Sequence, residues 1–265
     1  MQCLIDGDLL LYEVAFGGQF KEETEDGEFI IVPRNFDDVA IKFDEKVTQI
    51  EAECWATEPS IVYMTGKTNF RNAIAKKKPY KGNRKQDKPF HYGNLKAYAK
   101  AMYDVRWEEG LEADDLMTIE QALREDTIIC TRDKDLRIGE GMHFGWACGL
   151  QEQFGPKYVD KIGTLELIDG KKIKGTGLLF FYSQIITGDT VDNIAGLPRG
   201  GPALAYKSLH GLTDEQEMFE AVSQLYKAKY EETWEEEMLE QGQLLWMVNE
   251  LVDGKPVMWE FPNGR

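Results

Sequence analysis

The 265-residue sequence has few cysteines and no long apolar run, and each shortage excludes a class of protein. The four cysteines, Cys3, Cys54, Cys130 and Cys148, lack CxxC spacing, which argues against a zinc site and a disulfide framework. No stretch approaches the roughly 18 apolar residues of a membrane span, and the N-terminus lacks a signal-peptide pattern. We therefore expect a reduced, cytoplasmic, soluble protein, whose 42% hydrophobic content excludes a wholly disordered chain.

Two kinds of catalytic signature are also absent. The sequence contains no phosphate-binding P-loop, so ATP hydrolysis has no support. The three histidines, His91, His143 and His210, are isolated, and no Ser/His/Asp or Cys/His arrangement is convincing. The chemistry is therefore not expected to depend on a nucleophilic side chain.

Charge is unevenly distributed along the chain. Acidic residues outnumber basic ones by 47 to 31, for a net charge of −16. Residues 67–88 nevertheless contain nine Lys or Arg residues and a single acid, Asp87, with Phe70 and Tyr80 among the cations. This composition predicts a flexible positive loop that follows a phosphate backbone and stacks on a base, with a merely solvated loop as the alternative. The acidic stretch 213–240 is predicted to be a solvated face.

Alternating strand and helix patterns predict the fold. Apolar runs at 2–5, 60–64 and 127–131 are typical of buried strands, and Asp169-Gly170 predicts a hairpin turn between 164–168 and 171–174. Helices are expected from Asn35 through Ile50 and over 92–103, 112–124, 178–186, 202–209, 215–229 and 232–248. We expect an α/β core with a mainly parallel sheet flanked by helices in residues 1–175, including a basic arch or loop at 67–90, and a helical portion in 176–265 packed on that core.

Acidic residues form four short groups near the expected strand and helix ends, where open parallel sheets bind ligands. The groups are Asp6 with Asp8, Glu112 with Asp114 and Asp115, Asp133 with Asp135, and Asp189 with Asp192. Taken singly, each group has a structural explanation, because acids complement a helix N-terminus and Asp beside Gly is ordinary in turns.

If the four groups converge, they predict a metal site. Nine carboxylates in a small volume repel one another unless cations or protons compensate their charge. Oxygen ligands without His or Cys select Mg²⁺ or Mn²⁺ rather than Zn²⁺. Two such ions roughly 4 Å apart activate a water and stabilise the leaving oxygen of a phosphoryl transfer.

Six segments, read in order, resemble the 5′-nuclease superfamily, which includes flap endonucleases, the 5′-nuclease domain of bacterial DNA polymerase I and the bacteriophage 5′–3′ exonucleases. The similarity is greatest to the bacteriophage enzymes. The segments are IDGD (5–8), YKGNR (80–84), EADD (112–115), TRDKD (131–135), GDTVDN (188–193) and GLPRGGP (196–202). They follow the order of the family over most of the chain, and YKGNR and EADD are the most specific.

The resemblance implies a PIN-like core, a helix-three-turn-helix-like element in the C-terminal portion, and two bound Mg²⁺ or Mn²⁺ ions. The first ion is assigned to Asp6, Glu112 and Asp114. The second is assigned to Asp115, Asp133, Asp135, Asp189 and Asp192. The residues implied in catalysis are Lys81, Arg84, Asp6, Asp114, Asp133 and Asp135.

The resemblance also implies a path for nucleic acid. Tyr80, Lys81 and Arg84 would lie at the base of a helical arch, where the tyrosine stacks on a base and the cations bind the scissile phosphate, with Lys81 stabilising transition-state charge. The glycine-rich turn at 196–204 would bind duplex phosphates through backbone N–H groups. The residues assigned to nucleic-acid binding are Lys67, Arg71, Tyr80, Lys81, Arg84, Arg199, Gly200, Gly201 and Lys207.

The sequence departs from the family at two places. Family members usually have a further metal-binding Asp after the second core strand, where this chain has Met64-Thr65-Gly66-Lys67. Either Asp8 compensates or the first ion is held more loosely. An apolar residue usually separates the two glycines that are adjacent here as Gly200-Gly201, which leaves open whether the turn binds K⁺.

The expected protein is a metal-dependent 5′–3′ exonuclease and flap endonuclease. It is expected to act as a monomer on DNA ends, flaps, gaps or RNA–DNA hybrids, with possible RNase H activity. The resemblance further implies a role in phage DNA replication and primer removal in the host cytoplasm. Two alternatives stay open: a PIN-like single-strand ribonuclease, and a non-catalytic module that binds flaps or a replication partner.

Overall fold

The computed structural model describes residues 1–84 and 87–262; Lys85 and Gln86, in the expected basic loop, lie outside the described residues. The chain forms two compact units that alternate along the sequence. Unit 1 comprises Met1–Lys67, Lys85–Arg132 and Met142–Lys157, and unit 2 comprises Thr68–Arg84, Asp133–Gly141 and Tyr158–Arg265. The segments 68–84 and 133–141 therefore belong with the C-terminal portion, whereas the predicted division into domains at residue 175 stays a prediction.

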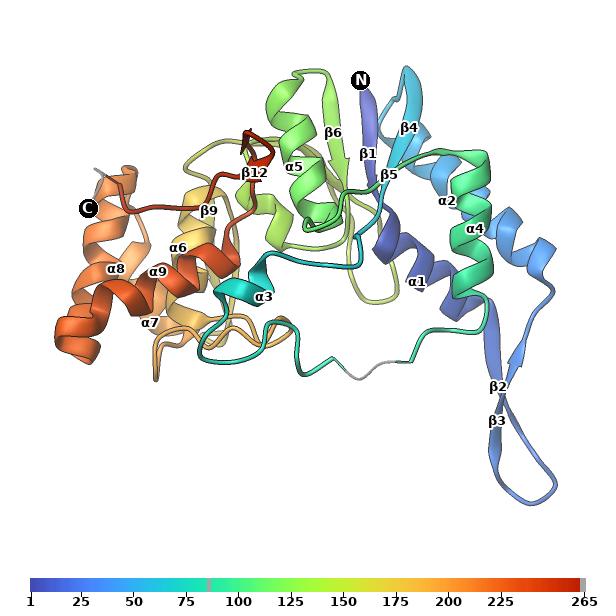
Figure 1. Ribbon diagram of the computed structural model, residues 1–265, viewed down its shortest axis with the longest axis horizontal. Coiled ribbons are helices and arrows are strands. Elements are labelled where there is room, and N and C mark those ends of the chain that lie inside the picture. Colours follow the sequence, from blue (N-terminus) through green and yellow to red (C-terminus); the bar gives the residue numbers. More distant parts are fainter. Residues whose placement is uncertain (85–86, 263–265) are drawn as a thin grey trace. The chain divides into compact units, whose positions relative to one another are not determined.

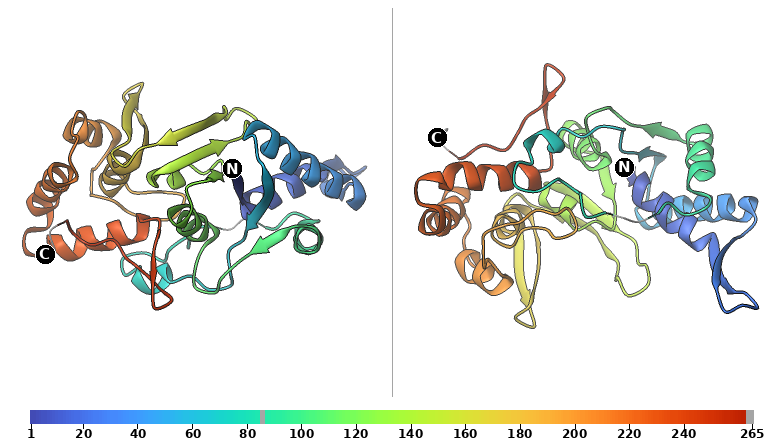
Figure 2. Two further views of the ribbon diagram at one scale, coloured as in Figure 1. Left: turned by 90° about the horizontal axis from the view of Figure 1, so that it is seen from above. Right: turned by 60° about the horizontal axis from the view of Figure 1, so that its bottom comes forward.

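Unit 1 is built on a six-stranded sheet with the strand order β5-β4-β1-β6-β7-β8 (Figure 2). The strands are β5 (Asp104–Arg106), β4 (Glu58–Tyr63), β1 (Gln2–Asp6), β6 (Thr127–Cys130), β7 (Gly141–Gly145) and β8 (Phe154–Val159). The neighbours from β5 to β7 all pair in parallel. The predicted α/β fold class with a mainly parallel central sheet is confirmed.

Helices cover both faces of this sheet. Helices α1 (Gly7–Gly17), α2 (Phe36–Glu53) and α4 (Tyr92–Met102) pack together on one face, and α5 (Ala113–Leu123) contacts β1, β4 and β6 on the other. Because successive residues of a strand point to opposite faces, every residue of β1 from Cys3 to Asp6 is buried. The Asn35 side chain caps α2 by accepting the Asp37 N–H (3.0 Å). This cap and the buried helical row Val39, Phe43, Val47 and Ile50 confirm the predicted helix.

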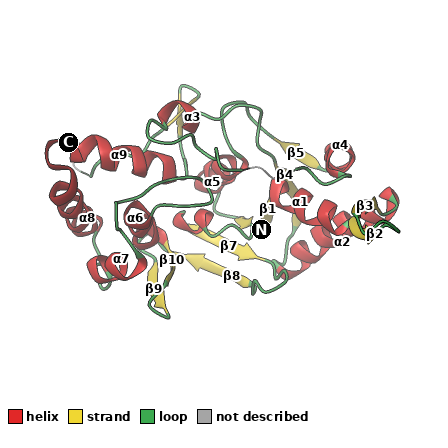
Figure 3. Cartoon of the chain, turned by 90° about the horizontal axis from the view of Figure 1, so that it is seen from below, coloured by secondary structure: helices red, strands yellow, loops and turns green. Residues whose placement is uncertain are grey.

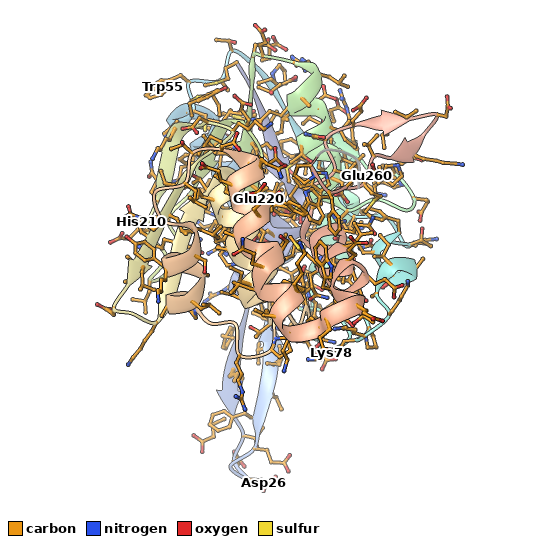
Figure 4. All side chains as sticks on the ribbon, turned by 90° about the vertical axis from the view of Figure 1, so that its left-hand side faces the viewer. Asp26, Trp55, Lys78, His210, Glu220 and Glu260 are labelled. Atoms are coloured by element: carbon orange, nitrogen blue, oxygen red, sulfur yellow. The ribbon has the colours of Figure 1, made fainter. Side chains whose placement is uncertain are left out.

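An antiparallel hairpin connects α1 and α2. Strands β2 (Gln19–Glu23) and β3 (Phe29–Pro33) form it, and Asp26 lies at its tip (Figures 1 and 4). Its residues from Phe20 to Ile31 are mostly exposed, so it adds little to the core of unit 1.

Unit 2 is organised around α6 (Gly177–Thr187) (Figure 3). All residues of α6 from Gly177 to Ile186 are buried, as expected for a helix that is apolar on every side. The other elements of unit 2 are α3 (Arg71–Ile74), β9 (Thr164–Ile168), β10 (Lys172–Thr176), α7 (Pro202–Leu209), α8 (Glu215–Tyr230), α9 (Trp234–Leu245), β11 (Leu251–Val252) and β12 (Lys255–Pro256), with short 3₁₀ turns at Asp135–Ile138 and Glu231–Thr233. The predicted hairpin is β9–β10, whose turn residues Asp169 and Gly170 both have positive φ.

Three strands of the sheet were not predicted. Strand β5 is only three residues long, of which two are charged, β7 contains two glycines, and β8 contains Gly155 and Pro156, so none of the three shows a clear strand pattern. Among the helices of the described chain, none combines the length and the apolar character that crossing a membrane requires.

Candidate active site

Asp6 lies at the junction of β1 and α1. Its Oδ1 accepts the Leu9 backbone N–H (3.0 Å), which caps α1, and its Oδ2 accepts the hydroxyl of Thr131 (2.7 Å), the residue that follows β6. The side chain is buried. These contacts hold a carboxylate at the C-terminal ends of two adjacent parallel strands, which is the ligand-binding edge of an open sheet.

Asp8 is held at the end of the next strand, β4. Its Oδ2 accepts the backbone N–H of Thr65 (2.8 Å), and the Thr65 hydroxyl accepts the N–H of Ala113, the first residue of α5 (3.1 Å). Thr65 belongs to the segment in which superfamily members usually have an additional Asp. The structure thus brings the Asp8 carboxylate to the C-terminal end of β4.

The acids at the start of α5 have different surroundings. Glu112 and Asp115 form a reciprocal capping box, in which Asp115 Oδ2 accepts the Glu112 N–H (3.2 Å). Both side chains are buried, whereas Asp114 is partly exposed. Helix capping therefore explains part of this motif, and Asp114 is the member whose side chain is partly exposed.

Unit 2 brings together Asp133, Asp135 and Asp189 around a lysine. The Lys134 ammonium lies 2.7 Å from Asp135 Oδ1 and 3.3 Å from Asp189 Oδ2. Asp135 Oδ1 also accepts the Gln184 amide (2.6 Å), and Asp133 Oδ1 accepts the Asp135 N–H (2.9 Å). An ammonium between two carboxylates marks a position that stabilises a cation.

The pKa values of these acids reflect the cost of placing several charges in a buried site. Burial raises the pKa of Asp133, and burial together with the Asp133 charge raises the pKa of Asp135 to about 7. Burial also opposes ionisation of Asp189, but Lys134 and hydrogen bonds outweigh it and lower its pKa. A bound cation would relieve the repulsion that Asp133 and Asp135 experience.

We expect Asp135→Asn to stabilise the metal-free protein at pH 8. The folded-state pKa of about 7 exceeds the ordinary value of 3.8. The contribution of this carboxyl to the free energy of unfolding is therefore fully present below about pH 4 and is lost as the pH rises through 7. Asn has no charge to bury, and we expect a gain of roughly 1–3 kcal/mol at pH 8 that shrinks at pH 5.

Urea unfolding in the presence of a chelator at both pH values measures this gain. Asp253→Asn, at the exposed turn between β11 and β12, is the matched control and should change neither value. A lower stability of Asp135→Asn at pH 8 would show that the contacts of Asp135 with Lys134 and Gln184 outweigh the cost of burying its charge.

The YKGNR motif is bound to the GDTVDN loop within unit 2. Asp192 accepts the Tyr80 hydroxyl (2.9 Å) and an Arg84 guanidinium N–H (2.6 Å), and the Lys81 ammonium lies 3.6 Å from it. The backbone of the two segments is joined as well, because the Lys81 N–H donates to the Asp192 carbonyl (3.0 Å). The loops therefore form one structure in which a carboxylate occupies the anion position of the basic motif.

Side-chain amides extend this connection. Asn83 donates to the Thr190 carbonyl (2.7 Å), and Asn193 donates to the Pro79 carbonyl (2.9 Å). Lys81 and Asn193 both have positive φ, a conformation that is uncommon outside glycine. The local backbone is thus determined by contacts between residues more than a hundred positions apart in sequence.

Two residues that were predicted to contact nucleic acid, Arg71 and Tyr80, are buried in the structure. Arg71 is fully buried and donates to the carbonyls of Leu244 (3.2 Å) and Trp246 (2.6 Å), so the prediction that it binds nucleic acid is wrong. The ring of Tyr80 is also buried, with Lys81 and Arg71 near its face. Lys67 is exposed, as expected for a phosphate contact.

The basic segment is less free than its composition suggests. Glu240 Oε1 accepts the backbone N–H groups of Lys76 (2.9 Å) and Lys77 (3.0 Å), and the Lys77 ammonium pairs with Glu237. The expected flexible loop is therefore wrong for Lys76 and Lys77, which are held by these contacts. The expectation that residues 213–240 form only a solvated face is wrong for Glu237 and Glu240.

The glycine-rich turn precedes α7, and Gly201 is its N-cap residue. Gly200 is required by close packing, because a Cβ atom there would clash with the carbonyl oxygen of Ile186. Arg199 and, on α7, Lys207 are exposed. Arg199 thus precedes the N-terminus of α7, whereas Lys207 lies in the last turn of that helix.

The donor set fits hard divalent ions. Within residues 1–84 and 87–262, no three carboxylates bring one oxygen each within 4.8 Å of one another. Mg²⁺ commonly takes one or two carboxylates and keeps several waters, which suits the pairs found here. Asp135 with Asp189 in unit 2, which share the Lys134 ammonium, is therefore a suitable partial coordination shell, and in unit 1 Asp6 and Asp8 lie at the ends of the neighbouring strands β1 and β4.

Three contributors to these arrangements were missed by the sequence analysis. Gln184 is an amide inside a buried apolar helix, and such a polar residue is a signal that could have found it. Lys134 lies between the predicted ligands Asp133 and Asp135 in the sequence, and its motif alone gives it no role of its own. Nothing in the sequence singles out Thr65.

The succession of elements and the parallel sheet give the chain the fold of the 5′-nuclease superfamily, close to that of the phage 5′–3′ exonucleases. The D15 protein of bacteriophage T5, crystallised with metal ions, has a TM-score of 0.55 at 14% identity, covering 91% of this chain and 88% of that chain. The T5 5′-exonuclease with bound zinc ions has a TM-score of 0.53 at 15% identity, covering 91% and 99%. The resemblance inferred from sequence is confirmed at the level of the fold.

A third solved structure, the T5 D15 flap endonuclease with DNA and metal ions, has a TM-score of 0.50 at 14% identity, covering 92% of this chain and 98% of that chain. No protein-family model and no functionally curated protein matches the sequence.

Proposed function

We propose that the protein is a divalent-metal-dependent 5′–3′ exonuclease and flap endonuclease acting on DNA. The observation that supports this most strongly is the joining of the YKGNR motif to the Asp192 loop in a chain with the 5′-nuclease fold. The motif places an ammonium and a guanidinium on one carboxylate, a geometry that also suits a phosphate. A similar structure contains DNA and metal ions, which supports the same ligands here.

Each unit contains carboxylates that are candidate ligands for a metal ion, for which Mg²⁺ or Mn²⁺ fits the donor chemistry. In unit 1 the candidates are Asp6, Asp8, Glu112 and Asp114, and Asp115 caps α5. In unit 2 the candidates are Asp133, Asp135, Asp189 and Asp192. When bound, two such ions activate a water and stabilise the leaving oxygen of phosphodiester hydrolysis. K⁺ at the glycine-rich turn stays open.

The basic motif would bind and orient the scissile phosphate. In the absence of substrate, Asp192 occupies the donors of Lys81 and Arg84, so the phosphate would replace a carboxylate rather than water at these groups. Lys81, a compact point charge that is mostly shielded from solvent, is the group best suited to stabilise charge that develops in the transition state. The half-exposed Arg84 is better suited to hold the strand.

The remaining surface cations would bind the rest of the nucleic acid. Lys67, Arg199 and Lys207 are exposed, and the Gly200-Gly201 turn precedes a helix N-terminus, where phosphates bind favourably. We extend the proposal to ends, flaps and gaps in DNA and to RNA–DNA hybrids, with a role for a monomer in phage DNA replication and primer removal in the host cytoplasm.

Cleavage assays test the proposal. A 5′-labelled flap, a duplex with a free 5′ end and a single-stranded RNA are incubated with the protein in Mg²⁺ or in a chelator. Mg²⁺-dependent release of products from the DNA substrates is expected. Cleavage of the RNA alone would favour a PIN-like ribonuclease, and flap binding without cleavage of any substrate would favour a non-catalytic module.

We expect Asp8→Asn to weaken Mn²⁺ binding and lower cleavage by roughly 10- to 100-fold, because it removes a negative charge near the first proposed ion. Asn keeps an oxygen that can accept the Thr65 N–H, so the fold should persist. Mn²⁺ titration and initial rates measure both effects. Asp26→Asn at the hairpin tip is the control, and equal behaviour of the two variants would show that Asp8 does not compensate for the missing Asp.

A further inference from the structure

Three of the four cysteines meet in the core of unit 1, although their sequence spacing had suggested scattered residues. Cys3 lies in β1, Cys130 ends β6 and Cys54 follows α2. Their sulfur atoms all lie within 4.8 Å of one another, and the Cys54 and Cys130 sulfurs are 3.8 Å apart. All three are fully buried, and all three are free thiols.

The sheet register explains how the cluster forms. The parallel pairing places Cys3 opposite Ile128 and Ile5 opposite Cys130, so Cys3 and Cys130 share the face that α1 and α2 cover. The end of α2 adds the third thiol to this face. Cysteine packs as a small apolar residue, but apolar packing alone does not require three sulfurs from three separate elements to converge.

The spacing suits a metal ion with three sulfur ligands. Bonds of about 2.3 Å from each sulfur to a central ion place the sulfurs about 4 Å apart, close to the separation found. Thiolates prefer soft ions, and within the described residues the group contains no imidazole or carboxylate that would favour a harder one. We propose that Cys3, Cys54 and Cys130 form a binding site for a soft, thiophilic metal ion of the Cu(I) type.

Metal binding would change the protonation of the cluster. Hydrogen bonds from the Cys130 and Cys54 thiols lower the pKa of Cys3, whereas burial raises the pKa of Cys130. As sulfur–metal bonds replace sulfur–hydrogen bonds, the thiols would lose their protons to solvent. Binding therefore releases protons in a number that can be measured.

The thiol site is chemically separate from the carboxylates and does not rest on the proposed nuclease function. Cys3 shares β1 with Asp6, and Cys130 immediately precedes Thr131, which donates to Asp6. An ion held by the three thiolates would join β1, β6 and the end of α2. Its expected effect is to stabilise the part of unit 1 that supports Asp6.

Titration of the reduced, full-length protein with Cd²⁺, a spectroscopic probe for soft-metal sites, tests the proposal. We expect ultraviolet sulfur-to-cadmium charge-transfer absorption that saturates at one ion per chain, proton release, and a rise of several degrees in the unfolding temperature. Cu(I) should compete for the site, and Mg²⁺ should not. A parallel arm refolds the protein from urea in the presence of Cd²⁺, so that slow entry into the buried site cannot mask binding.

Two single-thiol variants and a matched control complete the experiment. Cys54→Ser and Cys130→Ala should each lose much of the absorption and the thermal shift, and circular dichroism reports whether each remains folded. Cys148→Ser, outside the cluster, should behave as the parent. Equal absorption in the parent and in a folded cluster variant would overturn the proposal, as would the absence of charge-transfer absorption from the parent in both arms.

Discussion

The double variant Asp133→Asn/Asp135→Asn should lose Mg²⁺-dependent cleavage of a 5′-labelled flap almost completely. These two acids and Asp189 form the acidic group of unit 2, and burial raises the pKa of both Asp133 and Asp135. Replacing them removes the charge that would hold an ion worth several kcal/mol of transition-state stabilisation. We expect a rate loss on the order of 10³ or more.

Initial cleavage rates and Mn²⁺ titration should be measured side by side. The metal affinity should fall together with the rate, while the unfolding temperature of the metal-free variant should not fall, because the substitutions remove buried negative charge. Asp253→Asn supplies a charge-matched change on the surface of the same unit. Equal cleavage by parent and double variant would refute the assignment of the unit 2 carboxylates.

Lys81→Ala should produce the second large loss, roughly 10²- to 10³-fold in the rate of the chemical step, with only a modest change in DNA affinity. The Lys81 side chain is only 21% exposed, and its ammonium lies 3.6 Å from Asp192, the carboxylate that occupies the motif's anion position. Arg84 and the Tyr80 hydroxyl would still bind Asp192, so the loop connection should survive the substitution.

Single-turnover rates at saturating protein separate this effect from binding, which a DNA titration in Ca²⁺ measures. Lys78→Ala, an exposed lysine of the same basic segment (Figure 4), should change either quantity only slightly. If Lys81→Ala loses affinity and keeps its single-turnover rate, Lys81 positions the backbone and does not stabilise the transition state.

The contacts within unit 2 change how the charge distribution of the sequence is interpreted. The net charge of −16 argues against nucleic acid as a ligand, and the positive segment at 67–88 argues for it. Much of the described segment is committed to contacts within unit 2: Arg71 is buried, Lys77 pairs with Glu237, and Lys81 and Arg84 face Asp192. The count of basic residues therefore overstated how many are free to bind phosphate.

Local features of the fold were accessible from sequence because their causes are local. Asn35 caps the helix whose apolar residues recur at helical spacing, and Asp169-Gly170 supplies the positive φ values that a tight hairpin needs. The short strands β5 and β7 were missed because their stability comes from pairing with neighbours rather than from their own patterns. The motifs that resemble the 5′-nucleases likewise predicted the correct fold.

The sequence by itself determined the classes of residue, their local elements and the acidic and basic motifs of this protein. Tertiary structure alone decided which of them meet: Asp6 with Thr131 across 125 positions, Tyr80 with Asp192 across 112, and Cys54 with Cys130 across 76. Periodicity and capping involve residues a few positions apart, whereas these meetings depend on strand register, helix packing and loop path. For that reason Arg71 became a core residue, Asp8 reached the end of β4, and three distant cysteines formed one cluster.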